Sequence, residues 1–188
     1  MGTEIEKKYR VTEAAALVLG ARLAACGAEA RGVEFEENTL YAGPGLDERT
    51  TALRLRRVGA RAWLTYKQRS PTTAGIKRQR EDETEVGDAD ALADILDALG
   101  YRPALVYEKR RATWLYGGAE VLVDELPFGW FVEIEGSEEA INEVEQRLGL
   151  DAAEVEHEHY PGLTRRFGVA RGTLVEARFP ITAAPPQV

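Results

Sequence analysis

Charged and apolar residues alternate along several short segments of this chain, and this alternation restricts the possible fold more than any other feature. The first such segment reads Glu4-Ile5-Glu6-Lys7-Lys8-Tyr9-Arg10-Val11. Successive side chains of a β-strand point to opposite faces, so the charged residues at the even positions share one face. A sheet of such strands has an apolar face that helices can cover and a charged face that needs a polar occupant.

The same alternation returns in later segments, with charges of both signs. Its charged members are Arg54 and Arg56, then Lys67, then Lys77, Glu81, Glu83 and Glu85, then Lys109 and Arg111, then Asp124, and finally Glu133 and Glu135. If the apolar faces pack under helices, the charged faces converge on one cavity. Burying a charge costs several kcal/mol unless the ion is paired and hydrogen-bonded. The pattern therefore favours a ligand-binding cavity over a charged core that only stabilises the fold.

The residue types in this cavity indicate the chemistry of its ligand. Arginine and lysine are donors suited to a highly anionic substrate, and arginine is the better bidentate partner of phosphate oxygens. Glutamate and aspartate clustered without histidine or cysteine suit a hard divalent cation such as Mg²⁺ or Mn²⁺. Both sets together describe a site for a metal and a polyphosphate, in which the metal neutralises part of the phosphate charge.

The overall composition argues against several other classes of protein. A net charge of −8 over 188 residues is not that of a nucleic-acid binder, which normally has a basic balance. No apolar stretch approaches the roughly 18 residues of a membrane span, and the N-terminus lacks the apolar core of a signal peptide. The single cysteine, Cys26, has no partner for an internal disulfide, which is typical of a reducing compartment. We therefore expect a soluble, cytoplasmic protein.

Turn and capping signals divide the chain into about eight strands with helices between them. Thr12, Asp88 and Ser137 are N-cap residues ahead of helices that run to about residues 26, 99 and 149, and Asp151 opens a further short helical stretch. Hairpin spacing and turn glycines favour an antiparallel sheet, which tends to close when it is long. We expect one domain over residues 1–170, with a helical C-terminal part at 137–170 and a flexible tail at 171–188.

Taken in order, these segments resemble the CYTH superfamily, also called the triphosphate tunnel metalloenzymes. That family has an N-terminal Glu-x-Glu-x-Lys, paired arginines, a strand lysine, an acidic strand, a Lys-x-Arg, a strand aspartate and a final Glu-x-Glu. The matching residues are Glu4, Glu6 and Lys8, Arg54 and Arg56, Lys67, Glu81 to Glu85, Lys109 and Arg111, Asp124, and Glu133 and Glu135. Seven elements in the family's order, within residues 3–136, make the resemblance specific.

The resemblance implies an α+β fold in which an eight-stranded antiparallel β-barrel closes around a triphosphate tunnel, with helices on its outside. It implies that a triphosphate and Mg²⁺ or Mn²⁺ bind in the tunnel. The phosphate ligands carried over by position are Lys8, Arg54, Arg56, Lys67, Lys109 and Arg111. The metal ligands carried over are Glu4, Glu6, Asp124, Glu133, Glu135 and a residue of the acidic strand, where Glu83 or Glu85 is favoured and Glu81 stays open.

The first functional hypothesis is a metal-dependent hydrolase of inorganic tripolyphosphate, thiamine triphosphate or a nucleoside triphosphate. In it, Glu133 or Glu135 orients the attacking water and Lys67 stabilises the leaving oxygen. The second is a class IV adenylyl cyclase, in which the ribose 3′-hydroxyl attacks the α-phosphorus of ATP. The third is a non-catalytic module that binds polyphosphate or nucleotide, against which the complete acidic set argues. The start of the chain looks closer to bacterial tripolyphosphatases, so hydrolysis is favoured.

The segment after the last motif carries fewer signals. His157 and His159 lie in an acidic stretch without a nearby cysteine, and we interpret them as surface residues rather than metal ligands. A late lysine of some family members is not evident, and Arg165 or Arg166 is the candidate to replace it. Family members are often dimers, but no pattern in this sequence requires a homodimer.

Overall fold

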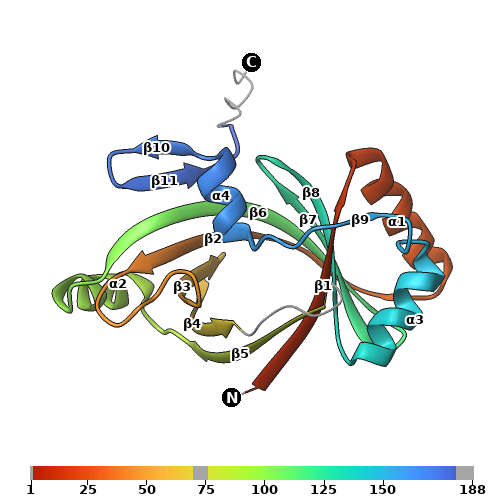
Figure 1. Cartoon of the computed structure of the whole chain (residues 1–188), viewed down its shortest axis with the longest axis horizontal. Helices are drawn as coiled ribbons and strands as arrows, with labels where there is room; N and C mark the ends of the chain where they lie inside the picture. The colour runs from red at the N-terminus through yellow and green to blue at the C-terminus, as the bar shows by residue number, and fades with distance from the viewer. Residues whose placement is uncertain (1, 70–75, 181–188) are drawn as a thin grey trace.

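The computed structural model describes residues 2–69 and 76–180, and its centre is a β-barrel (Figure 1). The wall strands are β1 Gly2–Val11, β2 Glu29–Ala42, β3 Thr51–Val58, β4 Arg61–Arg69, β5 Ile76–Glu85, β6 Arg102–Tyr116, β7 Ala119–Leu126 and β8 Gly129–Glu135. Their order around the wall is β6-β2-β3-β4-β5-β1-β8-β7, and β7 pairs with β6 again. Each of these pairings is antiparallel, so the sheet closes on itself.

This closed antiparallel barrel confirms the predicted fold class. The hairpin between β6 and β7 shows how local sequence sets the connections. Gly117 and Gly118 have φ values of +59° and +77°. A tight hairpin turn of this kind needs a left-handed backbone at both central positions, and glycine adopts it without steric cost.

Four helices of the described residues lie outside the barrel, and the first three of them were predicted from their N-cap residues. They are α1 Glu13–Ala25, α2 Ala89–Ala98, α3 Glu138–Leu148 and α4 Tyr160–Phe167. Side chains of Thr12, Asp88 and Ser137 accept hydrogen bonds from backbone N–H groups at the starts of α1, α2 and α3. None of the helices in the described part of the chain is long and apolar enough to span a membrane.

The apolar strand faces point outward under the helices, and the charged faces point into the barrel. Val132 and Ile134 of β8 are fully buried in a core that includes Leu23 of α1 and Ile141 of α3. On the other face of β8, Glu133 lines the barrel interior. The alternation in the sequence therefore translates directly into an apolar outer layer and a charged interior.

The C-terminal part differs from the expectation of a helical segment over 137–170 and a flexible tail from residue 171. The stretch after Asp151 forms no helix, and β9 (Glu154–Val155) pairs with β1. After α4, β10 (Val169–Arg171) and β11 (Leu174–Ala177) form a hairpin, and β11 runs parallel to β6.

Contacts with distant strands explain this difference. Arg178 forms ion pairs with Glu37 of β2 at 2.5 Å and with Glu108 of β6 at 2.9 Å, which anchor the hairpin to the barrel. Local sequence does not reveal such partners. Residues 70–75 and 181–188 lie outside the described residues.

Candidate active site

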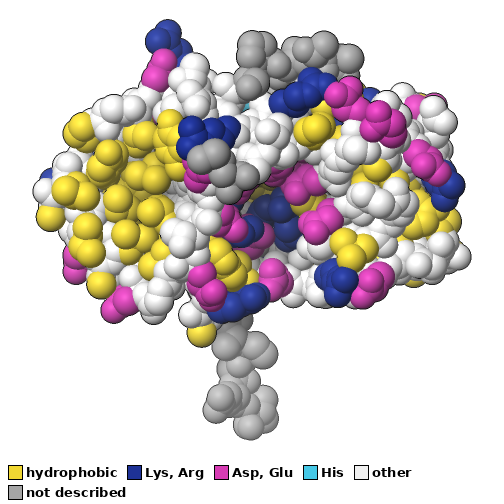
Figure 2. All heavy atoms as spheres, turned by 90° about the horizontal axis from the view of Figure 1, so that it is seen from below, with side chains coloured by type: hydrophobic (Ala, Val, Ile, Leu, Met, Phe, Trp, Pro, Cys, Tyr) yellow, Lys and Arg dark blue, Asp and Glu magenta, His cyan; other side chains and the backbone are white. Residues whose placement is uncertain are grey.

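The barrel interior holds a cavity of about 360 Å³ with a mostly charged wall. Seen from below, the barrel shows acidic and basic side chains gathered around a central hollow (Figure 2). All eight wall strands contribute lining residues, and the start of α4 adds His159, Tyr160 and Pro161. The charged lining residues are Glu4, Glu6, Lys8, Arg54, Arg56, Lys67, Arg69, Glu81, Glu83, Lys109, Arg111, Glu120, Glu133 and Glu135.

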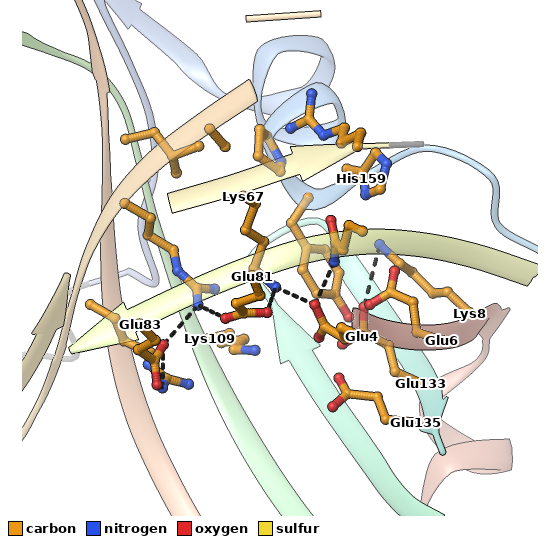
Figure 3. Close-up of a pocket in the computed structure, with 18 of the residues that line it drawn as sticks. Glu4, Glu6, Lys8, Lys67, Glu81, Glu83, Lys109, Glu133, Glu135 and His159 are labelled. Carbon is orange, nitrogen blue, oxygen red and sulfur yellow. Dashed lines mark hydrogen bonds and ion pairs between the residues drawn. The ribbon is translucent and has the colours of Figure 1, made fainter. Parts of the chain in front are cut away.

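Three carboxylates form a cluster at one end of this cavity (Figure 3). Glu4 and Glu6 lie on β1, and β8 places Glu135 opposite Glu6. One oxygen of each carboxylate lies within 4.8 Å of the others. Burial raises the pKa of Glu135 to about 8, and the negative charges of Glu4 and Glu133 contribute to the rise. The positive charge of Arg111 lowers the pKa but does not outweigh these effects. Crowded oxygen donors of this kind fit a hard divalent cation, which would relieve their repulsion.

The raised pKa of Glu135 predicts how the stability of the metal-free protein depends on pH. The window of interest runs from pH 6.5, the ordinary pKa of histidine, to pH 8, so that histidine titration contributes little to it. Within this window the folded state keeps a proton on Glu135 that the unfolded chain has released. The folded state binds more protons, so the free energy of unfolding falls as the pH rises through this window. We expect a loss on the order of 1 kcal/mol, measured as a Tm lower by a few degrees at pH 8.

Two comparisons test the origin of this slope. Glu135→Gln should remove it, and saturating Mg²⁺ should raise the Tm of the wild type more at pH 8 than at pH 6.5. Above pH 8 the free energy of unfolding should rise again. Burial and the charge of Lys8 lower the pKa of Lys77 to about 8, so above this pH the folded state has released a proton that the unfolded chain still binds. A Tm of the metal-free wild type that stays constant or rises between pH 6.5 and 8 contradicts the prediction.

Strands β3 and β4 carry three of the predicted phosphate ligands into the cavity. Lys67 Nζ lies 2.8 Å from Glu4 Oε2 and 2.8 Å from Glu81 Oε2. Arg56 Nη2 donates to Glu83 Oε1 at 3.1 Å. The buried Nε atoms of Arg54 and Arg56 have no hydrogen-bond partner among the described residues. These guanidinium groups therefore keep donors that an anionic ligand can use.

A second charge network lies where β6, β7 and β8 meet. Arg111 donates through Nε and Nη2 to Asp124 at 2.7 and 2.6 Å, and its Nη2 also donates to Glu133 at 2.5 Å. Asp124 is 0% exposed and also accepts from Lys109 at 3.5 Å and from the Tyr160 hydroxyl at 2.7 Å. Burial raises the pKa of Asp124, but Arg111 and Lys109 outweigh it and hold the pKa below its ordinary value. This network presents Lys109 and Arg111 on the cavity wall.

Comparison with known families agrees with this arrangement. The family described as CYTH domain matches residues 2–158, which include all eight wall strands and the carboxylate cluster. The chain belongs to the CYTH family. Among curated proteins, no sequence match was found.

Solved structures share the CYTH fold of this chain. The PH1012 protein from Pyrococcus horikoshii OT3 is 25% identical, with a TM-score of 0.73 over 85% of this chain and 98% of that one. A proposed adenylate cyclase from Vibrio parahaemolyticus is 23% identical, with a TM-score of 0.66 over 85% and 96%. HpAC1 from Hippeastrum, a proposed adenylyl cyclase with a dominant triphosphatase activity, is 18% identical, with a TM-score of 0.70 over 87% and 95%. The last two likenesses establish the fold alone.

The seven predicted metal ligands of this CYTH chain do not form one cluster. Among the described residues, Glu4, Glu6 and Glu135 place carboxylate oxygens within 4.8 Å of one another, and the other four are not members of this group. Glu83 accepts from Arg56 and from the Thr65 hydroxyl, and Glu85 is exposed and does not line the cavity. The remaining two, Asp124 and Glu133, are engaged by Arg111. All six predicted phosphate ligands line the cavity.

His159 corrects the interpretation that both histidines lie on the surface. His157 is exposed, but His159 immediately precedes α4 and lines the cavity (Figure 3). Burial, and then the charges of Lys77 and Arg69, lower the pKa of His159 to about 2. The start of α4 fixes the position of His159, and the residues around it gave no signal that a helix begins there.

Sequence reasoning also missed Glu36, Arg69 and Tyr107. Glu36 is 1% exposed and lies 3.4 Å from Lys109 Nζ. Burial raises the pKa of Glu36, but Lys109 and Arg111 lower it to about 2. The available signal was the alternation within β2, where Glu36 and Asn38 are buried on one face and Phe35 is exposed on the other. Arg69 and Tyr107 line the cavity two residues from Lys67 and Lys109, on the same strand faces, so the alternation was again the available signal.

Proposed function

We propose that this CYTH protein is a divalent-metal-dependent hydrolase of triphosphate substrates. One observation carries the proposal: a cluster of three carboxylates and six predicted phosphate ligands share one cavity inside a closed barrel. A cation-binding set beside an array of Lys and Arg donors matches the needs of phosphoryl transfer, which is catalysed chiefly by positioning and charge stabilisation. The substrates proposed are inorganic tripolyphosphate, thiamine triphosphate and nucleoside triphosphates.

In this proposal, Lys8, Arg54, Arg56, Lys109 and Arg111 hold the phosphate chain, and their fixed positions keep the reacting phosphorus in line. Mg²⁺ or Mn²⁺, held by Glu4, Glu6 and Glu135, supplies Lewis-acid chemistry at the phosphoryl group when bound. Protein side chains orient the attacking water and stabilise the leaving oxygen.

Two side chains act directly on the reacting groups in this mechanism. Glu133 lies 3.4 Å from Lys8 and 2.5 Å from Arg111, whereas Glu135 forms no ion pair within the described residues. Glu135 is therefore the better group to orient the attacking water. Lys67, whose Nζ lies 2.8 Å from Glu4 of the cluster, stabilises the leaving phosphate oxygen.

An assay of three substrates tests the proposal. Purified protein is incubated with tripolyphosphate, thiamine triphosphate and ATP under Mg²⁺ or Mn²⁺, with EDTA as the metal-free control. Release of orthophosphate that EDTA abolishes is the expected result. Cyclic AMP and pyrophosphate from ATP would instead identify an adenylyl cyclase. Tight binding of every triphosphate without turnover at any metal concentration would identify a non-catalytic binding module.

A further inference from the structure

Lys77 is a buried cation whose ammonium forms no hydrogen bond to any described residue. Its side chain is 2% exposed, and its Nζ has no hydrogen-bond partner among the described residues. Glu6 Oε1 lies 3.4 Å away, within ion-pair distance but without hydrogen-bond geometry. Burying an ammonium group costs free energy that hydrogen bonds normally offset, so an unsatisfied one needs an explanation.

The lysines that line the cavity are better compensated. Lys109 Nζ lies 3.4 Å from Glu36 and donates to Asp124 at 3.5 Å, and Lys67 has two carboxylate oxygens at 2.8 Å. Lys8 Nζ donates to the Glu158 carbonyl at 3.1 Å. Lys77 therefore differs from these neighbours in having an ammonium that no protein oxygen within the described residues satisfies.

Lys77 is not among the residues that line the cavity, but the alternation of β5 turns its side chain to the barrel interior. Lys77 shares the inward face of β5 with Gln79, Glu81 and Glu83, which all line the cavity. In the register between β5 and β1 it lies opposite Glu6, a member of the carboxylate cluster. The lysine side chain is flexible, so a small rotation would bring Nζ to a ligand bound beside Glu6.

Positive charge is concentrated around this point. Lys8 and Arg69 line the same cavity as His159, and their charges and that of Lys77 all act on the His159 ring. An anion placed here would gain from several cations at once, and it would also satisfy the Lys77 ammonium.

We propose that Lys77 is a further phosphate-binding residue, whose ammonium donates to a phosphoryl oxygen of the triphosphate bound beside Glu6. This inference rests on the proposed function and adds a ligand that the motifs did not supply. Without substrate, the missing hydrogen bonds of the Lys77 ammonium are a cost to the fold. With substrate bound, the charge becomes a contribution to affinity.

Binding measurements on Lys77→Met test the proposal without relying on turnover. Isothermal titration with inorganic tripolyphosphate in EDTA at pH 7 should show affinity at least ~10-fold below the wild type, because a charge-assisted hydrogen bond is lost. Lys77→Gln, neutral and polar, should show a similar loss and guards against misfolding of the methionine variant.

Lys7→Met is the matched control. Lys7 lies on β1 outside the cavity lining, and its Nζ donates to Glu145 of α3 at 2.6 Å. This variant should keep the wild-type affinity for tripolyphosphate, although it breaks an ion pair to Glu145.

Unchanged affinity in both Lys77 variants overturns the assignment and leaves Lys77 as only an ion-pair partner of Glu6. Hydrolysis under Mg²⁺, measured separately, distinguishes this failure from failure of the proposed function. A wild type that binds tripolyphosphate through Lys77 but releases no orthophosphate supports the assignment and contradicts the hydrolase. A wild type that hydrolyses tripolyphosphate while the Lys77 variants bind it normally supports the hydrolase and contradicts the assignment.

Discussion

Glu4→Gln should lower kcat on tripolyphosphate by at least ~10²-fold, the size of effect seen when one preorganised electrostatic partner is removed. The amide keeps the shape of the side chain but removes one of the three charges in the Glu4, Glu6 and Glu135 cluster. The fold should persist, because less like charge is crowded at this end of the cavity. Steady-state kinetics at saturating Mg²⁺ measure the effect, and thermal unfolding verifies the fold.

Glu34→Gln provides the control for this loss. Glu34 forms an ion pair with Arg61 at 2.8 Å, has about half of its side chain exposed, and is not part of the cavity lining. Its removal should leave kcat unchanged. Near-normal turnover in Glu4→Gln, or an equal loss in both variants, would refute the role of the carboxylate cluster.

Arg111→Met should destabilise the protein by about 3–5 kcal/mol, because it leaves a buried carboxylate without its main partner. Asp124 is 0% exposed and receives two of its hydrogen bonds from the Arg111 fork at 2.6 and 2.7 Å. Lys109, at 3.5 Å, compensates little of that loss. Denaturant unfolding at pH 7 measures the change, and the corresponding fall in Tm is about 10 °C for a domain of this size.

The neighbouring Arg110 supplies a matched control for this prediction. Arg110→Met removes a surface ion pair to Glu125 at 3.0 Å, in which the arginine is 47% exposed, so its cost should stay below about 1 kcal/mol. Adding Asp124→Asn to Arg111→Met should recover part of the stability, because the orphaned charge disappears. Equal costs for Arg110→Met and Arg111→Met would show that the buried network does not stabilise the barrel.

Much of this architecture follows from local sequence. Alternation alone predicted which face of each strand carries charge, and Glu133 on the inside and Val132 on the outside of β8 show that it did so correctly. The capping residues Thr12 and Asp88 marked the starts of α1 and α2 for a similarly local reason, since their side chains satisfy backbone donors within three residues.

Other features depend on partners far apart in the chain. The β10–β11 hairpin is held by Arg178 against Glu37 and Glu108, which are 141 and 70 residues away. His159 joined the cavity only because α4 begins beside it. The residues around Arg178 and around His159 show no periodic pattern that would indicate either arrangement.

The chain's own alternation was sufficient to predict a charged cavity and to name most of the residues inside it, whereas the closed eight-stranded barrel was implied by the resemblance to the CYTH superfamily. Alternation could not predict how carboxylates and cations pair in the cavity. Glu135 remains in a crowded cluster while Glu133, two residues earlier on the same face, is engaged by Arg111. Alternation specifies only the face of the strand on which a side chain lies. The nearest opposite charge depends on strand register and on closure of the barrel wall. Register and closure therefore decide which charged groups stay free for a ligand.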